Sequence, residues 1–328
     1  RHRRIKLFPR LIANILLRYI LPYQNRLGLV IGALRFFQQS GLQNAARKTR
    51  VIRLISNSLA ELEKSAPEVP ASTFKAKGQI IPAKVSRRAR VALLSGCVMP
   101  LVNGPEMDGV VRVLARNGCE VVVTKGQVCC GAINSHVGDL DVARSMAKHN
   151  IDAFLASDVD AVVVASAGCG VRMKEYDILL RGDEEYCQKA EKFSAMVRDV
   201  HEFLVDLPFN PPQVHLDYRV TYQDSCHLSH AQRVTRAPRE LLRSIPGLVF
   251  TEMDNSTRCC GAGGTYSITQ REFSLKLLDS KMSTVRDTDA EVVATANPGC
   301  MIQLKYGTNR VGIPLKVRYV TDLLDEAY

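Results

Sequence analysis

The sequence predicts an α/β protein made of two pseudo-symmetric halves, each a short parallel sheet flanked by helices, after an N-terminal helical segment. The first observation is a cysteine pattern that occurs twice. In the first half, 31 residues separate Cys97 from the pair Cys129-Cys130, and 38 more separate that pair from Cys169. In the second half, 32 and 39 residues separate Cys226, Cys259-Cys260 and Cys300 in the same way. Corresponding cysteines of the two halves are 129, 130 or 131 positions apart, which indicates an internal repeat.

The second observation is a regular alternation of apolar runs with helical patterns. Strands are predicted at 91–94, 120–124 and 160–165, then at 218–222, 248–252, 291–295 and 317–320. Helices are predicted between them; Met107, Val110 and Leu114, for example, have helical spacing. Such alternation favours Rossmann-like parallel sheets, whose sites form at the carboxyl ends of the strands. Each cysteine position follows a strand, so we expect those of one half to meet.

The domain organisation follows from the same reading. We predict a basic helical segment at 1–63, a proline-interrupted linker at 64–90, and cysteine-rich domains at 91–212 and 213–328. Helical spacing begins at Ile12, Ile15, Leu16 and Tyr19 and resumes at 27–37 and 52–62, and residues 183–205 are predicted to be a charged helical extension. The apolar face of the first segment either packs on the main domain or lies on a membrane surface.

Charge is unevenly distributed along the chain. The net charge is +11, yet residues 1–90 hold 19 Lys and Arg against three Glu, or +16, which leaves −5 for the remainder. This indicates an anionic surface or acidic partner, or else a solvated helix face and a basic linker. No aromatic-interleaved basic motif or zinc-finger spacing is present, so we expect no nucleic acid partner.

The start of the sequence has no secretory signal. Residues 11–21 are the most apolar stretch, but Arg18 interrupts them and they are too short to span a bilayer. The chain begins with Arg1 and not Met, so we expect that its true N-terminus is missing.

The cysteines are candidates for metal or redox chemistry in a reducing compartment, because a chain of 328 residues needs no disulfide framework. The candidate metal ligands form a first thiol set (Cys97, Cys129, Cys130, Cys169) and a second thiol set (Cys226, Cys259, Cys260, Cys300). Four thiolates suit zinc or an iron–sulfur cluster. Two adjacent cysteines can bind different irons of a cluster, whereas an adjacent pair is unusual around a single zinc ion. Cys119 and Cys187 lie outside the pattern and are predicted to be structural.

Other residues lie near the pattern. His136, His227 and His230 are predicted to be hydrogen-bonded neighbours of the site or plain structural residues rather than ligands. Arg172 and Arg258 either raise a cluster potential or are simply exposed. The glycines at 261–264 suggest phosphate binding only weakly, because the full dinucleotide fingerprint is missing.

The residues around these cysteines carry a family resemblance. Ser95-Gly96-Cys97-Val98, Ala167-Gly168-Cys169-Gly170, Cys226-His227-Leu228, Cys259-Cys260-Gly261 and Asn297-Pro298-Gly299-Cys300 resemble the cysteine-rich CCG domain. That domain occurs in the cysteine-rich subunit of heterodisulfide reductase, in lactate-utilisation complexes and, with the most similar flanking residues, in the glycolate oxidase iron–sulfur subunit.

The resemblance implies an electron-transfer subunit of a glycolate (2-hydroxy acid) dehydrogenase, an oxidoreductase acting on CH–OH. A partner subunit that binds FAD would oxidise the substrate, and [4Fe–4S] clusters, or zinc at one site, would occupy the thiol sets. Electrons would pass toward a quinone pool, which implies a cytoplasmic protein, peripheral on the inner membrane face. The alternatives are a heterodisulfide-reductase-like or lactate-utilisation subunit and a zinc-binding interaction domain without redox activity.

Two departures from the family matter. The two-cluster ferredoxin module has no counterpart, since no Cys precedes Cys97, so either the chain is a fragment or a partner supplies the module. The reductase has a fifth cysteine per site where this chain has Arg172 and Gln303. This favours conventional clusters and electron relay over disulfide chemistry.

Overall fold

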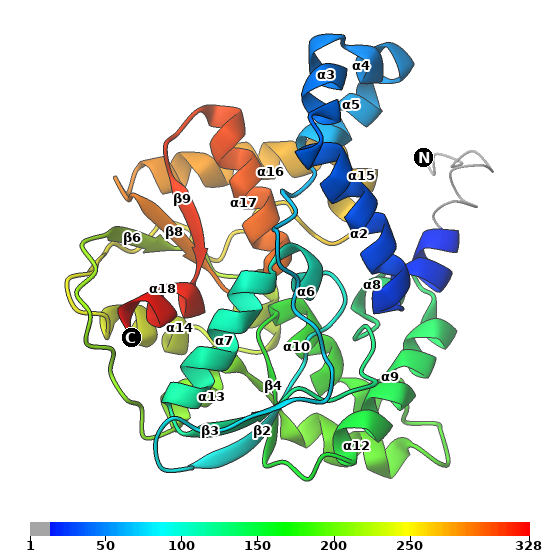
Figure 1. Ribbon diagram of the computed structural model, residues 1–328, viewed down its shortest axis with the longest axis vertical. Coiled ribbons are helices and arrows are strands. Elements are labelled where there is room, and N and C mark those ends of the chain that lie inside the picture. The colour runs from blue at the N-terminus through cyan, green and yellow to red at the C-terminus, as the bar shows by residue number, and fades with distance from the viewer. Residues whose placement is uncertain (1–13) are drawn as a thin grey trace.

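A computed structural model describes residues 14–328 of the chain (Figure 1). The N-terminal segment contains the π-helix η1 (Leu16–Ile20) and the helices α2 (Gln24–Gln39), α3 (Leu42–Lys48), α4 (Val51–Ile55) and α5 (Asn57–Lys64). Figure 1 shows α3, α4 and α5 projecting beyond the rest of the molecule, while α2 runs back toward it. No helix within residues 14–328 combines the length and apolarity needed to cross a bilayer.

The first half is built on a five-stranded sheet of order β1-β3-β2-β4-β5, in which only the edge strand β1 is antiparallel. Its strands are β1 (Ile80–Ile81), β2 (Ala89–Leu93), β3 (Cys119–Val122), β4 (Ala161–Val164) and β5 (Val197–Asp199). Its helices are α6 (Met99–Val102), α7 (Gly104–Arg116), α8 (Ala132–His136), α9 (Leu140–Leu155), α10 (Ala167–Lys174), α11 (Tyr176–Leu179), α12 (Cys187–Met196) and α13 (Val200–Asp206).

The second half has a four-stranded, fully parallel sheet of order β7-β6-β8-β9. Its strands are β6 (Arg219–Tyr222), β7 (Val249–Phe250), β8 (Val292–Thr295) and β9 (Lys316–Tyr319). Its helical elements are the π-helix η2 (His227–Ala231), α14 (Arg236–Arg243), α15 (Tyr266–Thr269), α16 (Arg271–Arg286), α17 (Pro298–Val311) and α18 (Val320–Ala327).

Strand register confirms that the two halves are repeats of one unit. Val91 of β2 pairs with Ala161 of β4, and Val220 of β6 pairs with Val292 of β8. These pairs differ by 129 positions on the first strand and by 131 on the second, as the cysteines do. The predicted α/β class with two parallel-sheet halves is therefore correct.

The sequence-based prediction was wrong in three places. It placed β1 in a linker and β5 in a helical extension, because strands of two and three residues carry too little periodicity to be distinguished. The third N-terminal helix is two helices, because Ser56 is extended and its hydroxyl caps α5 by accepting from the Leu59 amide at 3.4 Å. Ile12, placed in the first predicted helix, lies outside the described residues.

The N-terminal segment is only partly packed on the body. Leu27 of α2 is buried, and the Gln24 amide donates to Ser95 Oγ at 3.0 Å and to the Gly96 carbonyl at 2.8 Å. The N-terminus of α2 therefore supports the loop that carries Cys97. In contrast, Leu54 and Ile55 at the projecting end are 82% and 73% exposed.

Candidate metal centre

The first thiol set lies where three parallel strands end. Cys97 follows β2, Cys129 and Cys130 follow β3, and Cys169 is in the first turn of α10 after β4. Cys129 Sγ lies 3.2 Å from Cys97 Sγ. Hydrogen bonding between Cys129 and Cys130, and between Cys130 and Cys169, joins the remaining thiols. The predicted convergence of these four side chains at one end of the sheet is what the structure has.

The second thiol set repeats this placement. Cys226 follows β6, Cys259 and Cys260 follow β7, and Cys300 is in the first turn of α17 after β8. Cys226 contacts Cys259, and Cys260 contacts both Cys259 and Cys300. The Gly261 amide also donates to Cys259 Sγ at 3.3 Å.

Glycine follows both cysteine pairs for a conformational reason. Gly131 and Gly261 have φ of +78° and +87°, a region that side chains with a Cβ avoid. A Cβ at Gly131 would lie 3.3 Å from Ala143 Cα on α9, and at Gly261 it would overlap the Ser274 carbonyl oxygen on α16. The Cys-Cys-Gly turn can therefore lie flat against α9 in the first half and against α16 in the second.

All eight thiols line one cavity of about 240 Å³ between the two halves. The sequence predicts convergence within each half, but it does not predict that the two thiol sets face each other. The helices α10 and α17 also meet here through Asn297, which precedes α17. Its side-chain oxygen accepts from the Gly168 amide at 3.3 Å, and its nitrogen lies 3.6 Å from Cys300 Sγ.

The two thiol sets differ in electrostatics. In the first, hydrogen bonding to Cys130 together with burial raises the pKa of Cys169, and hydrogen bonding to Cys129 together with burial raises the pKa of Cys130. In the second, hydrogen bonds from Cys226 and Cys260 lower the pKa of Cys259, and a hydrogen bond from Cys260 lowers that of Cys300. In the same set, hydrogen bonding to Cys259 raises the pKa of Cys226, and hydrogen bonding to Cys259 and Cys300 raises that of Cys260, so each anionic sulfur there depends on a neighbouring thiol that stays protonated.

The histidines lie at the same boundary. His136 of the first half and His227 of the second line the cavity with ring centroids 5.7 Å apart. His227 Nδ1 lies 3.6 Å from Cys226 Sγ, which is consistent with a hydrogen-bonding role. Burial and the neighbouring charge of His227 lower the pKa of His136. His230 is exposed.

The remaining residues singled out in the sequence have ordinary contacts. Arg172 pairs with Glu175 at 3.2 Å, and Arg258 donates to Ser280 Oγ at 2.9 Å. Neither Cys119 nor Cys187 lines the cavity. Burial raises the pKa of Cys119 to about 12, as expected of a structural thiol.

The donor set fits an iron–sulfur cluster by its chemistry. Four thiols per half, which follow strand ends and surround a shared cavity, provide the ligands that such clusters use. Within residues 14–328, no three Cys, His, Asp or Glu side chains have an arrangement suited to a single metal ion.

Comparison with known proteins places the chain. A family model described as the cysteine-rich CCG domain matches residues 91–174 and 220–305. A second, described as the linker region of the glycolate oxidase iron–sulfur subunit, matches residues 8–66. A crystal structure of a hypothetical protein from Helicobacter pylori has a TM-score of 0.53 and 11% identity, covering 99% of this chain and 73% of that one, and so shares the fold.

Three relatives are informative. The chain is 40% identical to a probable glycolate oxidase iron–sulfur subunit from Bacillus subtilis, over 94% of this chain and 70% of the relative. It is 29% identical to the Escherichia coli glycolate oxidase iron–sulfur subunit, over 81% and 66%. It is 30% identical to lactate utilization protein A from a Geobacillus species, over 72% and 99%. The chain therefore belongs to the cysteine-rich CCG family of iron–sulfur subunits, with the glycolate oxidase iron–sulfur subunits among its members.

Proposed function

We propose that the chain is the electron-transfer subunit of a glycolate or similar 2-hydroxy acid dehydrogenase, with one [4Fe–4S] cluster held by each thiol set. The observation that carries this proposal is the cavity in which two sets of four thiols face each other. Such clusters accept and release single electrons. Zinc at one of the sets is the alternative occupant.

The side chains of this protein hold and shield the redox centres and do not contact the substrate bond that is oxidised. The thiols of each set come from the segments that follow three parallel strands, so the folded sheet fixes their spacing. Asn297 ties the two sets together through Gly168 and Cys300. The substrate chemistry belongs to a FAD-binding partner, a ferredoxin-type module supplies further centres, and a quinone receives the electrons.

Anaerobic purification followed by iron, sulfide and zinc analysis and electron paramagnetic resonance tests the proposal. We expect iron and sulfide with a cluster signal that Cys129→Ser removes and the matched variant Cys119→Ser retains. Zinc alone would overturn it, and so would equal effects of the two substitutions.

We also propose that the chain acts on the cytoplasmic side and docks peripherally on an anionic membrane through its projecting helices. Residues 42–64 hold five Lys and Arg against two Glu, beside the exposed Leu54 and Ile55. Apolar side chains flanked by cations bind anionic lipid surfaces. The fraction of protein that sediments with vesicles containing phosphatidylserine should fall for Leu54→Asp but not for Ile178→Asp. Ile178 is the control because it is an apolar residue of α11 that is 58% exposed. Equal binding of both variants would refute this surface.

A lactate-oxidising complex is the second candidate, because a lactate utilization protein matches over 72% of the chain. The two candidates are distinguished by purifying the chain with its FAD-binding partner subunit and comparing the rates at which glycolate and lactate reduce a quinone analogue. The domain boundaries at residues 63, 90 and 212 stay part of the proposal, to be tested by limited proteolysis.

A further inference from the structure

The frame around the two thiol sets is not the same in both halves. Gly131 packs against Ala143 of α9, and Gly261 packs against Ser274 of α16, so these helix positions correspond at an offset of 131. Seven residues further along each helix stand Asn150 and Lys281. Both side chains are completely buried.

Asn150 supports the first Cys-Cys-Gly turn with a neutral amide. Its oxygen accepts from the Val128 amide at 2.9 Å, and its nitrogen donates to the Cys129 carbonyl at 3.1 Å. The same nitrogen lies 3.2 Å from the Tyr176 hydroxyl, which donates to the Cys130 carbonyl at 2.9 Å. No formal charge enters this network.

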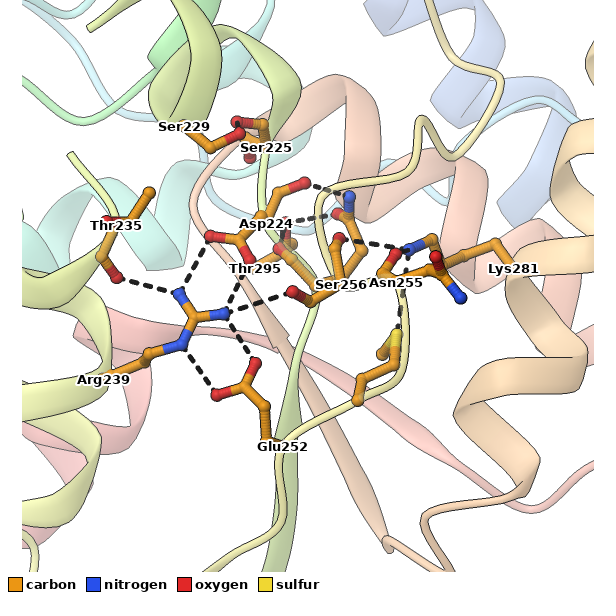
Figure 2. Close-up of polar contacts among 12 residues, drawn as sticks. Asp224, Ser225, Ser229, Thr235, Arg239, Glu252, Asn255, Ser256, Lys281 and Thr295 are labelled. Atoms are coloured by element: carbon orange, nitrogen blue, oxygen red, sulfur yellow. Dashed lines mark hydrogen bonds and ion pairs between the residues drawn. The ribbon is translucent and has the colours of Figure 1, made fainter. Parts of the chain in front are cut away.

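Lys281 supports the second turn with a cation (Figure 2). Its ammonium donates to the Asn255 carbonyl at 2.8 Å and to the Ser256 carbonyl at 3.1 Å, and lies 3.8 Å from Met253 Sδ. These three atoms, all acceptors, take up the three ammonium protons. The carbonyls belong to the loop that leads into Cys259 and Cys260.

Within residues 14–328, no carboxylate neutralises this cation directly. Among the described residues, no Asp or Glu lies within ion-pair distance of Lys281 Nζ. Asp224 is close, but Arg239 binds both of its oxygens, at 3.0 and 2.7 Å, so that pair carries no net charge (Figure 2). Glu252, the other partner of Arg239, is half exposed and screened by water.

The charge of Lys281 is also close enough to the second thiol set to interact with it. Burial lowers the pKa of Lys281, and the charges of Cys260, Asp224 and Cys300 act in the opposite direction. In a buried environment such charges interact far more strongly than in water. Any negative charge added at the second thiol set is therefore stabilised by the fixed cation of Lys281. The first thiol set has the neutral side chain of Asn150 at the equivalent position and gains no such stabilisation from it.

We propose that Lys281 is a positioning residue that raises the reduction potential of the centre held by the second thiol set above that of the first. The inference rests on the proposed function, since it concerns the centres that the thiol sets would hold. Reduction adds one electron, and a nearby buried cation favours the reduced form. One electron entering at the first thiol set would then pass to the second, so the asymmetry gives the relay a direction.

Redox titration with dithionite, followed by electron paramagnetic resonance, tests the proposal. Cys129→Ser and Cys259→Ser assign each signal to its thiol set. Lys281→Met should lower the reduction equilibrium constant of the second centre at least tenfold, about 59 mV for one electron, and leave the first unchanged. Lys281→Arg keeps the charge and should restore most of the shift. Asn150→Leu is the matched control, because it removes a buried polar contact in the first half without changing charge. The potential of the second centre should therefore stay unchanged in this variant.

The outcomes are distinguishable. An intact second centre with an unchanged potential in Lys281→Met overturns the inference and leaves the proposed function standing. Absence of iron from the unmutated protein overturns the proposed function itself. If Lys281→Met loses its second centre, Lys281→Gln retains a donor to the loop without the charge and must show the same tenfold fall. Loss of the centre in both neutral variants would mean that Lys281 only holds the loop, which also overturns the inference.

Discussion

Substitution of Gly261 by Ala probes the turn that presents the second cysteine pair. Gly261 has φ of +87°, and a Cβ there would overlap the backbone carbonyl oxygen of Ser274 in α16. Gly126 is a matched control, because its φ is +84° and nothing lies within 4 Å of its Cβ position. Gly131 is intermediate, with φ of +78° and a contact of 3.3 Å.

The magnitudes follow from separating backbone strain from overlap. A left-handed conformation costs a residue with a Cβ about 1–2 kcal/mol, which is all that Gly126→Ala should lose. Overpacking against a helix backbone adds about 1–3 kcal/mol, so Gly261→Ala should lose about 2–5 kcal/mol. Gly131→Ala should lie between them.

Urea unfolding of the anaerobically purified variants, with iron content measured in parallel, checks this order. Gly261→Ala should also lose iron at the second thiol set, because relief of the overlap moves the turn away from α16. If Gly261→Ala is no less stable than Gly126→Ala, the close approach of this turn to α16 is not a constraint and the argument fails.

Three further predictions concern polar groups that are wholly or partly buried. Arg239→Met leaves Asp224 buried without its partner and should cost about 3–5 kcal/mol in urea unfolding; a loss under 1 kcal/mol would contradict the burial of Asp224. Burial raises the pKa of Asp322 to about 7, so between about pH 4 and 7 the folded state holds a proton that the unfolded state releases, and stability should fall as the pH rises through this range. Asp322→Asn should make the thermal midpoint depend less on pH in this range, and an unchanged dependence would show that another group causes it. Asn297→Ala removes the contacts to Gly168 and Cys300 and should weaken magnetic coupling between the two centres in electron paramagnetic resonance, whereas an unaltered coupling would show that the halves stay in register without it.

Much of the fold could be predicted because the cysteines mark the ends of strands. A buried parallel strand such as β4 is a continuous apolar run, and Cys169 follows it directly. The same logic predicted the convergence of each thiol set. The strand β5 was missed because Arg198 interrupts its three residues, which then look like part of a charged helix.

The joint cavity could not be predicted, because a repeat in sequence says nothing of how its two copies face each other. That geometry depends on contacts between residues far apart, such as the Gln232 amide that donates to the Ala167 carbonyl at 3.0 Å. It also depends on Asn297, whose role in bridging α10 and α17 has no signature beyond helix capping. Likewise, the sequence alone does not show that Asn150 and Lys281 occupy equivalent positions in the two halves, because this depends on where each Cys-Cys-Gly turn contacts its helix.

The positions where a fifth thiol would stand in the reductase relatives already have structural partners in this chain. Gln303 donates to Ser274 Oγ at 3.1 Å, and that hydroxyl donates to the Gly261 carbonyl at 2.7 Å, so Gln303 fixes the second Cys-Cys-Gly turn. Arg172 forms an ion pair with Glu175, the C-cap residue of its helix. Both side chains are engaged with the protein, so under the proposed function each thiol set would provide four sulfurs and no fifth ligand from these positions. Four sulfurs leave no thiol beyond those that a cubane cluster needs, and this favours a pair of electron relays over a centre that forms and breaks disulfide bonds.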